Sequence, residues 1–276
     1  MRFEQLSGAG NHFLLLDARL SVEGEDVSRL GGAAARSWCA AAVDEGGMTP
    51  DGLLVLTESD VAAAQLVIWN TDGSLAAACG NGLRCVGWHL LRESGSEEVL
   101  IETQTGVRKV RGETSELGAE HLEAELGHVR VEPLGSDLAL LEGERAAWRG
   151  DVGNPHCVFL VEALRSARFE ERGRELQSAP LFPGGVNVGY LAEEAGRWHL
   201  RVYERGVGET GACGTGAAAA AAVLREALGV PFPLCLKLPE GELTVAELPD
   251  GGLSVTGGVE FRGSIRLDLQ GSDLGT

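Results

Sequence analysis

Basic residues, and lysines in particular, are scarce in this sequence of 276 residues. It contains 23 Lys and Arg residues against 41 Asp and Glu residues, and only Lys109 and Lys237 are lysines. The formal net charge at pH 7 is therefore −18, and such a charge repels phosphate backbones and anionic lipid. We expect a small or neutral partner, with no nucleic acid and no membrane among the partners.

Long apolar runs and paired cysteines are also lacking. No window approaches the roughly 18 to 20 apolar residues of a membrane span, and the first ten residues, MRFEQLSGAG, do not have the basic and apolar regions of a signal peptide. The six cysteines form no CxxC pair, which argues against a disulfide framework and against a metal site. We expect a cytoplasmic protein without a bound metal.

Three sequence blocks recur in the same order at about half the chain length. Cys79-Gly-Asn-Gly has a counterpart in Cys213-Gly-Thr-Gly, 134 residues later, and a helical pattern follows each. The other two pairs are Gly10-Asn-His with Gly153-Asn-Pro-His, and Pro50-Asp-Gly with Pro183-Gly-Gly. We interpret this as a duplicated domain. The expected repeats cover residues 1–120 and 121–262, with the last residues, about 263–276, packing back on the first repeat.

Each repeat has one strong helical pattern. Leu83–Glu93 is amphipathic, Ala217–Leu228 opens with six alanines, and Gly95 and Gly229 supply the expected helix ends. Weaker patterns predict two further helices, over Val27–Val43 and Ala163–Leu176.

Short apolar runs bounded by Gly, Pro, Asp or Ser predict strands. They cover residues 52–56, 64–69, 99–103, 156–161, 186–191 and 199–203. Because an alanine surface lets strands approach closely, we expect a sheet to wrap around each strong helix. The sequence thus predicts an α+β fold of two pseudo-symmetric domains, each a mostly antiparallel β-sheet or barrel around a central α-helix.

Cys79 and Cys213 each stand immediately before a Gly-x-Gly segment and a helix. Their thiols should therefore lie beside unpaired backbone N–H groups and the positive end of the helix dipole. That environment stabilises a thiolate, and the same N–H groups can bind a carboxylate. The remaining thiols are expected in the core: Cys39, Cys85, Cys157 and Cys235.

Two equivalent thiols suit the inversion of a stereocentre that carries a proton. Such an inversion needs a base on one face and an acid on the other, which Cys79 and Cys213 could supply if the repeats face one another. The usual alternative for amino acids is pyridoxal phosphate, which requires a Schiff-base lysine. Neither Lys109, in Arg-Lys-Val-Arg, nor Lys237, in a strand-like run, suits that use. We therefore expect no cofactor.

Several longer motifs resemble the diaminopimelate epimerase family. They are Gly8-Ala-Gly-Asn11, Asn70-Thr-Asp-Gly-Ser, Ala78-Cys79-Gly-Asn-Gly-Leu-Arg-Cys85, Gly153-Asn-Pro-His156 and Tyr203-Glu-Arg-Gly-Val-Gly-Glu-Thr-Gly-Ala-Cys213-Gly-Thr-Gly. The resemblance implies the family fold and a cofactor-independent isomerase that interconverts LL- and meso-diaminopimelate. It also implies a role in lysine and peptidoglycan precursor synthesis, and a homodimer.

The resemblance also implies roles for individual residues. Cys79 and Cys213 match the acid and base, the first called the donor and the second the acceptor by family convention, and His156 and Glu204 match residues that tune the thiols. The reacting carboxylate is expected on backbone amides, and the distal end of the substrate on Arg205 and neutral side chains, with Glu204 also available to the distal ammonium. The implied substrate-binding residues are Asn11, Asn70, Gly80, Asn81, Asn154, Asn187, Glu204, Arg205, Gly214 and Thr215.

The sequence departs from the family pattern at two positions near these motifs. His12 stands where the family usually has Asp, and Gly52 stands where some members place a substrate-contacting Gln. Neither departure affects a cysteine, so both concern affinity more than catalysis.

Other functions remain open on the residues alone. A proline racemase or hydroxyproline epimerase also opposes two cysteines, although the Asp-Gly-Ser and Glu-Arg-Gly-x-Gly-Glu-Thr segments argue against it. A phenazine-type isomerase would normally lack the paired cysteines. A cysteine hydrolase would need only one thiol, and a noncatalytic binding module would have unactivated thiols.

Overall fold

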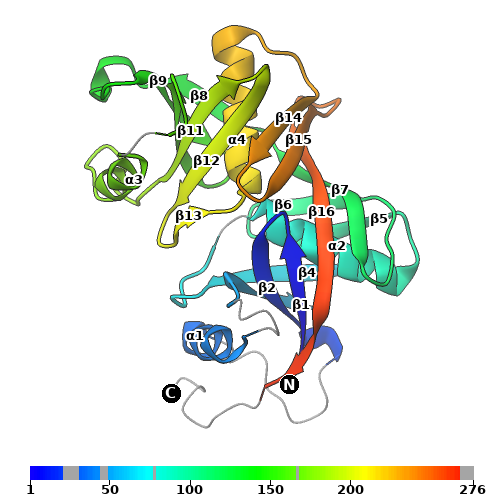
Figure 1. The fold of residues 1–276 in the computed structure, drawn as a ribbon. Coiled ribbons are helices and arrows are strands. Elements are labelled where there is room, and N and C mark those ends of the chain that lie inside the picture. Colours follow the sequence, from blue (N-terminus) through cyan, green and yellow to red (C-terminus); the bar gives the residue numbers. More distant parts are fainter. Residues whose placement is uncertain (21–30, 44–48, 77–78, 166–167, 268–276) are drawn as a thin grey trace. The chain divides into compact units, whose positions relative to one another are not determined.

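The computed structural model describes residues 1–20, 31–43, 49–76, 79–165 and 168–267, and divides into two compact units. Unit 1 comprises Met1–Ala124 with Gly258–Thr276, and unit 2 comprises Glu125–Gly257. Most strands of the two units and the helices inside them are labelled in Figure 1. Residues 268–276 of the expected C-terminal extension, and residues 27–30 of the expected second helix, lie outside the described residues.

Eight strands form a closed barrel in unit 1. Each strand bonds to the next in chain order, and the ring closes because β16 bonds to both β7 and β1. The strands are β1 Arg2–Gly8, β2 Asn11–Asp17, β3 Gly52–Thr57, β4 Ala64–Asn70, β5 Glu98–Thr103, β6 Gly106–Arg111, β7 Gly118–Gly127 and β16 Leu253–Arg266.

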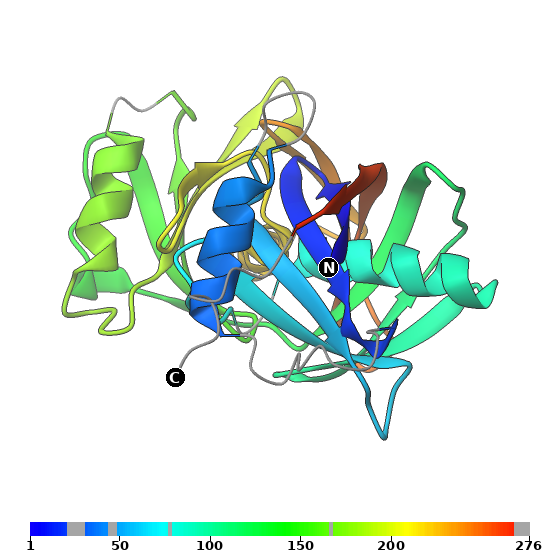
Figure 2. The same ribbon diagram turned by 90° about the horizontal axis from the view of Figure 1, so that it is seen from below.

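Helix α2, Gly80–Ser94, fills the interior of this barrel, and all its residues from Gly80 to Leu91 are buried. Gly87 allows a close approach, since a Cβ there would lie 2.4 Å from Val110 Cγ1 on β6. Helix α1, Gly32–Ala41, packs instead on the outer face of β3 and β4. Figure 2 shows the strands β1 to β4 lying between these two helices.

In unit 2, strands of the same sheet wrap around helix α4, Gly214–Leu228. Its strands bond in the order β8, β9, β10, β11, β12, β14, β15, β16, and β13 bonds to β12. They are β8 Arg130–Pro133, β9 Glu144–Asp151, β10 Pro155–Val161, β11 Asn187–Glu194, β12 Arg197–Glu204, β13 Gly208–Thr210, β14 Leu234–Leu238 and β15 Gly241–Glu247. Two short 3-10 turns, Ala18–Leu20 in unit 1 and Gly135–Asp137 in unit 2, complete the described elements.

The two units repeat one pattern of strand pairing. From β1 to β7 the successive pairs are antiparallel, parallel, antiparallel, parallel, antiparallel and antiparallel. The series β9, β10, β11, β12, β14, β15, β16 has the same succession. The α+β class, the mainly antiparallel sheets and the central helix of each unit are therefore confirmed.

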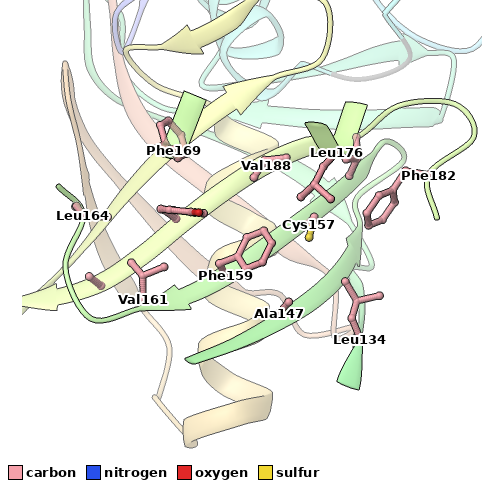
Figure 3. Close-up of a cluster of buried hydrophobic side chains, with 13 residues drawn as sticks. Leu134, Ala147, Cys157, Phe159, Val161, Leu164, Phe169, Leu176, Phe182 and Val188 are labelled. Carbon is pink, nitrogen blue, oxygen red and sulfur yellow. The ribbon is translucent and has the colours of Figure 1, made fainter. Parts of the chain in front are cut away.

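Helix α3, Phe169–Gln177, covers the outer face of the unit 2 sheet. Figure 3 shows the apolar cluster beneath it, in which Phe169 and Leu176 meet Cys157, Phe159 and Val188 from β10 and β11. Strand β10 is buried on both faces, so its alternate residues reach this cluster and α4 in turn. The prediction that Cys157 belongs to the core is confirmed.

Some element bounds differ from the sequence-based expectation. Helices α2 and α4 begin three residues before the predicted starts, because each helix begins directly after its cysteine. Helix α3 begins at Phe169, whereas the prediction began at Ala163, a residue outside any helix. The predicted glycine stops are confirmed, since Gly95 and Gly229 both end their helices with a φ of 68°.

The prediction that Cys235 is a core residue is wrong. Cys235 lies in β14, where Leu234, Leu236 and Leu238 point into the core and the alternate residues are exposed. Because side chains alternate between the two faces of a strand, the flanking leucines place the thiol on the outside. Cys39 and Cys85 are buried, as expected.

A buried charge network joins the far part of α2 to the barrel wall. His89 Nδ1 lies 2.9 Å from Glu4 Oε2, and its Nε2 lies 3.0 Å from Asp17 Oδ2. Burial alone would lower the pKa of His89, but the hydrogen bonds and charges of Asp17 and Glu4 raise it to about 9. Arg19 and Arg92 complete the network through Asp17 and Glu4.

The His89 network predicts a pH-dependent stability. Because the folded pKa of about 9 exceeds the ordinary histidine pKa of 6.5, the stabilising contribution of the network is complete below pH 6.5 and is lost as the pH rises through 9. We expect His89→Gln to reduce the free energy of unfolding by about 1–3 kcal/mol at pH 6, and by clearly less at pH 9.5. Urea unfolding at both pH values measures this. An equal loss at both would contradict the charge-network interpretation.

The contact of Gly87 with β6 predicts a steric effect. Gly87→Ala places a methyl group 2.4 Å from Val110 Cγ1 and should reduce the free energy of unfolding by about 1–3 kcal/mol, as overpacking does. Gly241→Ala is the control, because nothing lies within 4 Å of a Cβ there. Urea unfolding of both variants measures the effect, and equal stabilities would rule out the packing argument.

Candidate active site

The same cap begins the central helix of each unit. Cys79 is the N-cap of α2 and its Sγ accepts a hydrogen bond from Gly82 N at 3.3 Å, while Cys213 is the N-cap of α4 and accepts from Gly216 N at 3.4 Å. Both cysteines have extended backbone, as N-caps do. The remaining first-turn N–H groups of each helix are the type of group that binds anions.

In unit 1, a chain of polar side chains lies at the start of α2. Arg84 donates from its NH2 group to Asn81 Oδ1 at 2.8 Å, Asn81 Nδ2 donates to Asn11 Oδ1 at 2.5 Å, and Asn11 Nδ2 donates to Asp51 Oδ2 at 3.3 Å. Asn11, Asn81 and Arg84 are all buried. The structure therefore brings the predicted residues Asn11 and Asn81 together beside Cys79.

Asn70, another predicted binding residue, lies at the end of β4 and donates to Ser74 Oγ at 2.9 Å. It pairs across the sheet with Gly52, the first residue of β3. A Cβ at Gly52 would lie 2.8 Å from the carbonyl oxygen of Trp69, which explains why a glycine stands there. The backbone N–H of His12, the other departure from the family pattern, donates to Asp51 at 2.8 Å.

In unit 2, a carboxylate lies against the cap thiol. Cys213 Sγ donates to Glu204 Oε2 at 3.3 Å, and Thr210 Oγ1 donates to Glu204 Oε1 at 2.7 Å. Gln177, on α3, donates to the backbone carbonyl of Glu204 at 3.0 Å. Hydrogen bonds thus fix both the backbone carbonyl and the carboxylate of Glu204, and the second carboxylate oxygen accepts from the thiol.

A neutral histidine lies behind this thiol. His156 Nε2 is 3.1 Å from Asn154 Oδ1 and 3.1 Å from Thr215 Oγ1, and Thr215 Oγ1 is 3.5 Å from Cys213 Sγ. Burial, together with the charge of Arg205, lowers the pKa of His156 to about 3. These contacts therefore connect His156 to the Cys213 thiol through the Thr215 hydroxyl. Because its pKa is so low, the imidazole is uncharged at neutral pH.

Asn187 connects the remaining predicted residues of unit 2. Its Nδ2 donates to Pro155 O at 3.1 Å, and its Oδ1 accepts from the backbone N–H of Arg205 at 2.8 Å. The guanidinium of Arg205 donates to Gly184 O at 2.8 Å, and the side chain is exposed. An exposed guanidinium fixed at one corner can still receive a carboxylate.

Several residues at these sites were not predicted from the sequence. Thr210 and Gln177 hold Glu204, and Arg84 lies under the first turn of α2. Arg84 and Thr210 carried a usable signal, because both lie inside motifs that resemble the family, and Arg84 is also a charged residue in a helix whose neighbours are apolar or small. Gln177 lies in another element, outside those motifs, and had none.

The structure also groups three possible metal-ligating residues that the spacing rules did not suggest. Ligand atoms of Asp17, His89 and Glu93 lie within 4.8 Å of one another. Arg19 NH2, however, lies 2.6 Å from Asp17 Oδ2 and 2.7 Å from Glu93 Oε2. A guanidinium thus already neutralises both carboxylates, and we interpret the group as an ion-pair network.

Among the described helices, none has the length and apolar character needed to cross a bilayer.

The two buried histidines should titrate at opposite ends of the pH range. We expect the ring signals of His156 to stay those of a neutral imidazole from pH 8 down to pH 5, because its pKa is about 3, and those of His89 to change near pH 9. NMR of the histidine rings, assigned with His156→Gln and His89→Gln, measures this. A His156 signal that moves between pH 6 and 7 would contradict the buried, uncharged state.

The chain is similar to known proteins both in sequence and in fold. The family profile described as diaminopimelate epimerase matches residues 5–129 and 150–261. A diaminopimelate epimerase of Phenylobacterium zucineum is 34% identical over 280 residues, covering 95% of this chain and 97% of the relative. One of Rhizorhabdus wittichii is 36% identical over 268 residues, covering 93% and 92%.

Solved structures with low sequence identity share the fold. A phenazine biosynthesis protein of the PhzF family from Bacillus anthracis matches with a TM-score of 0.73 and 14% identity, covering 98% of this chain and 99% of that one. A hydroxyproline epimerase from Agrobacterium vitis matches with a TM-score of 0.65 and 16% identity, covering 96% and 91%. At these identities the likeness concerns the fold alone.

Proposed function

Because this chain belongs to the diaminopimelate epimerase family, we propose that it interconverts LL- and meso-2,6-diaminopimelate without a cofactor, by a two-base mechanism. The chain is thus an isomerase that acts on a small molecule. The observation that supports the mechanism is the repeated cap, in which a thiol and first-turn N–H groups stand together at the start of both central helices.

In the proposed reaction, one cysteine acts as a thiolate and takes the proton from the α-carbon. The other acts as a thiol and delivers its proton to the opposite face, so the configuration inverts and the two sulfurs exchange protonation states. Cys79 and Cys213 fill these roles, and their roles exchange with the configuration of the substrate. No external oxidant or reductant is needed, because only protons move.

The main energetic cost of such a reaction is the negative charge that develops when the α-carbon loses its proton and becomes a carbanion. We assign its stabilisation to backbone N–H groups of the two helix starts, at Gly80, Asn81, Gly214 and Thr215, which also bind the reacting carboxylate. Donors fixed in a water-poor site are already oriented when the charge develops. The first residues of both helices are buried, which supports this assignment.

The remaining predicted residues bind the substrate or adjust the protonation of the Cys213 thiol. Arg205 is proposed to bind the distal carboxylate and Glu204 the distal ammonium, through its side chain or backbone. Glu204, which accepts from Cys213 at 3.3 Å, and His156, linked through Thr215, tune the protonation of that thiol. Neutral amide groups complete the substrate-binding set at Asn11, Asn70, Asn154 and Asn187.

Hydrogen exchange tests the reaction class. We expect the purified, reduced protein to exchange the α-hydrogen of LL-diaminopimelate in D2O without added pyridoxal phosphate, as followed by proton NMR, and to leave L-proline in a parallel sample unchanged. Exchange of proline alone would place the protein among the proline racemases. Exchange of neither would contradict the proposed function.

Single substitutions test the two bases. Cys79→Ala and Cys213→Ala should each reduce kcat for epimerisation by at least about a thousandfold, since each removes one obligatory proton carrier. Cys235→Ala is the matched control, because Cys235 is an exposed thiol in a strand, and its activity should stay within twofold. If either variant retained activity with only one of the two cap cysteines, that result would favour a chemistry that needs a single thiol, such as hydrolysis.

The resemblance carries three further parts of this proposal. They are a role in lysine and peptidoglycan precursor biosynthesis, a cytoplasmic location and a homodimer. Sedimentation of the purified protein tests the last of these, and a mass of one chain, 28.9 kDa, at micromolar concentration would contradict it.

A further inference from the structure

Arg84 is a buried cation that the family-based roles leave without a function. Its side chain is fully buried, like all the residues of α2 from Gly80 to Leu91. Its guanidinium donates to Asn81 Oδ1 at 2.8 Å and to the carbonyl oxygen of Gly80 at 3.4 Å. Its Nε is buried and has no hydrogen-bond partner among the described residues.

The charge of Arg84 is not neutralised by a carboxylate. Within the described part of the chain it forms no ion pair, unlike Arg172, the comparably buried arginine of unit 2, which lies 3.3 Å from Glu144 Oε1. Burial lowers the pKa of Arg84 to about 10, so it remains charged at neutral pH. A buried charge is strongly unfavourable unless an opposite charge accompanies it.

The position in the helix makes this charge still less favourable. Arg84 contacts the carbonyl of Gly80 and the side chain of Asn81, the first two residues of α2, where the helix dipole is positive. A cation at this end destabilises a helix, whereas an anion stabilises it. Arg84 therefore requires an anion at the start of α2.

Cys79 is the group that can supply this anion. Two thiols are near Arg84: Cys85 follows it in the chain, and Cys79 directly precedes Gly80 and Asn81, the two residues that the guanidinium contacts. Burial raises the pKa of Cys85 to about 12, so that thiol stays neutral. Cys79 is only partly buried and already accepts an N–H group at the helix start. Other carboxylates near α2 in the described part of the chain already have partners: Asp51 bonds to Asn11, Glu4 and Asp17 bond to His89, and Glu93 pairs with Arg19.

Unit 2 has no equivalent cation. The position that corresponds to Arg84, five residues after the cap cysteine, is Ala218 in α4. There the cap thiol of Cys213 donates to the Glu204 carboxylate instead. The two helix starts thus differ in charge: a guanidinium bonds to the first turn of α2, whereas a carboxylate accepts from the cap thiol of α4.

From this difference we infer that Arg84 is a positioning residue for the proposed reaction, holding Cys79 as the thiolate and fixing the amide groups of Asn81 and Asn11. The inference rests on the proposed function and assigns the resting proton to Cys213. The amide orientation follows from the bonds themselves. Because Asn81 Oδ1 accepts from Arg84, Asn81 must donate through Nδ2 to Asn11 Oδ1, and Asn11 then donates to Asp51.

The pH dependence of thiol alkylation tests the electrostatic part. Iodoacetamide labelling is followed from pH 5.5 to 9.5 by peptide mass spectrometry, for Cys79 in a Cys213→Ala background and for Cys213 in a Cys79→Ala background. Arg84→Met should raise the Cys79 midpoint by about one to two pH units, which slows alkylation about ten- to hundredfold below both midpoints. The Cys213 midpoint should stay within about 0.3 units, well inside the shifts that a lost neighbouring charge causes.

Two further variants separate charge from geometry and from general destabilisation. Arg84→Lys keeps the charge but not the planar fork, so the Cys79 midpoint should hold while KM for diaminopimelate rises about fivefold or more. Arg172→Met removes a buried arginine from α3, and should lower stability without moving either midpoint. If Arg84→Met does not fold by circular dichroism, Arg84→Gln, which retains an amide donor, replaces it in the same measurement.

The inference is overturned if a folded neutral variant leaves the Cys79 midpoint unchanged, or if both thiols shift equally. It is also overturned if Arg172→Met produces the same shift. Alkylation needs no turnover, so a failed hydrogen-exchange experiment would reject the proposed function without deciding the role of Arg84. Conversely, normal hydrogen exchange together with an unchanged Cys79 midpoint in the Arg84 variant would reject the role of Arg84 and leave the proposed function standing.

Discussion

The start of a helix buried inside a sheet is the constraint on which this structure depends. The first N–H groups of such a helix have no partner within the helix, and leaving them buried and unsatisfied is costly. In both units the cap is a cysteine, whose sulfur accepts a weak hydrogen bond from the first turn. The first-turn N–H groups and the positive end of the dipole together form the type of surface that binds an anion.

The rest of each unit serves to keep that helix start in place. Strands surround α2 and α4 closely, and small residues permit this approach: Gly87 faces Val110 on β6, and six alanines begin the body of α4. The outer helices α1 and α3 bury the opposite faces of the sheets. The packed core therefore positions the caps, while the polar side chains around them come from strand ends and turns.

Duplication preserved the cap but not its electrostatic surroundings. In unit 1 a buried guanidinium lies beneath the first turn, and in unit 2 a carboxylate faces the thiol, with an uncharged histidine behind it. In the proposed reaction, one sulfur carries a proton and the other does not. The inferred role of Arg84 would favour one position of that proton, even though the two caps have the same backbone geometry.

The sequence by itself determined the repeat, the class of fold, the two cap cysteines and the family. These depend on local patterns, such as Cys-Gly-x-Gly before a helix and apolar runs between glycines, which the chain carries wherever it folds. The outward face of Cys235, the late start of α3, the partners of Glu204 and the buried charge of Arg84 were decided only by the tertiary structure. Each of these depends on which segments distant in sequence pack together, because burial and hydrogen-bond partners are properties of the folded surroundings and not of the neighbouring residues.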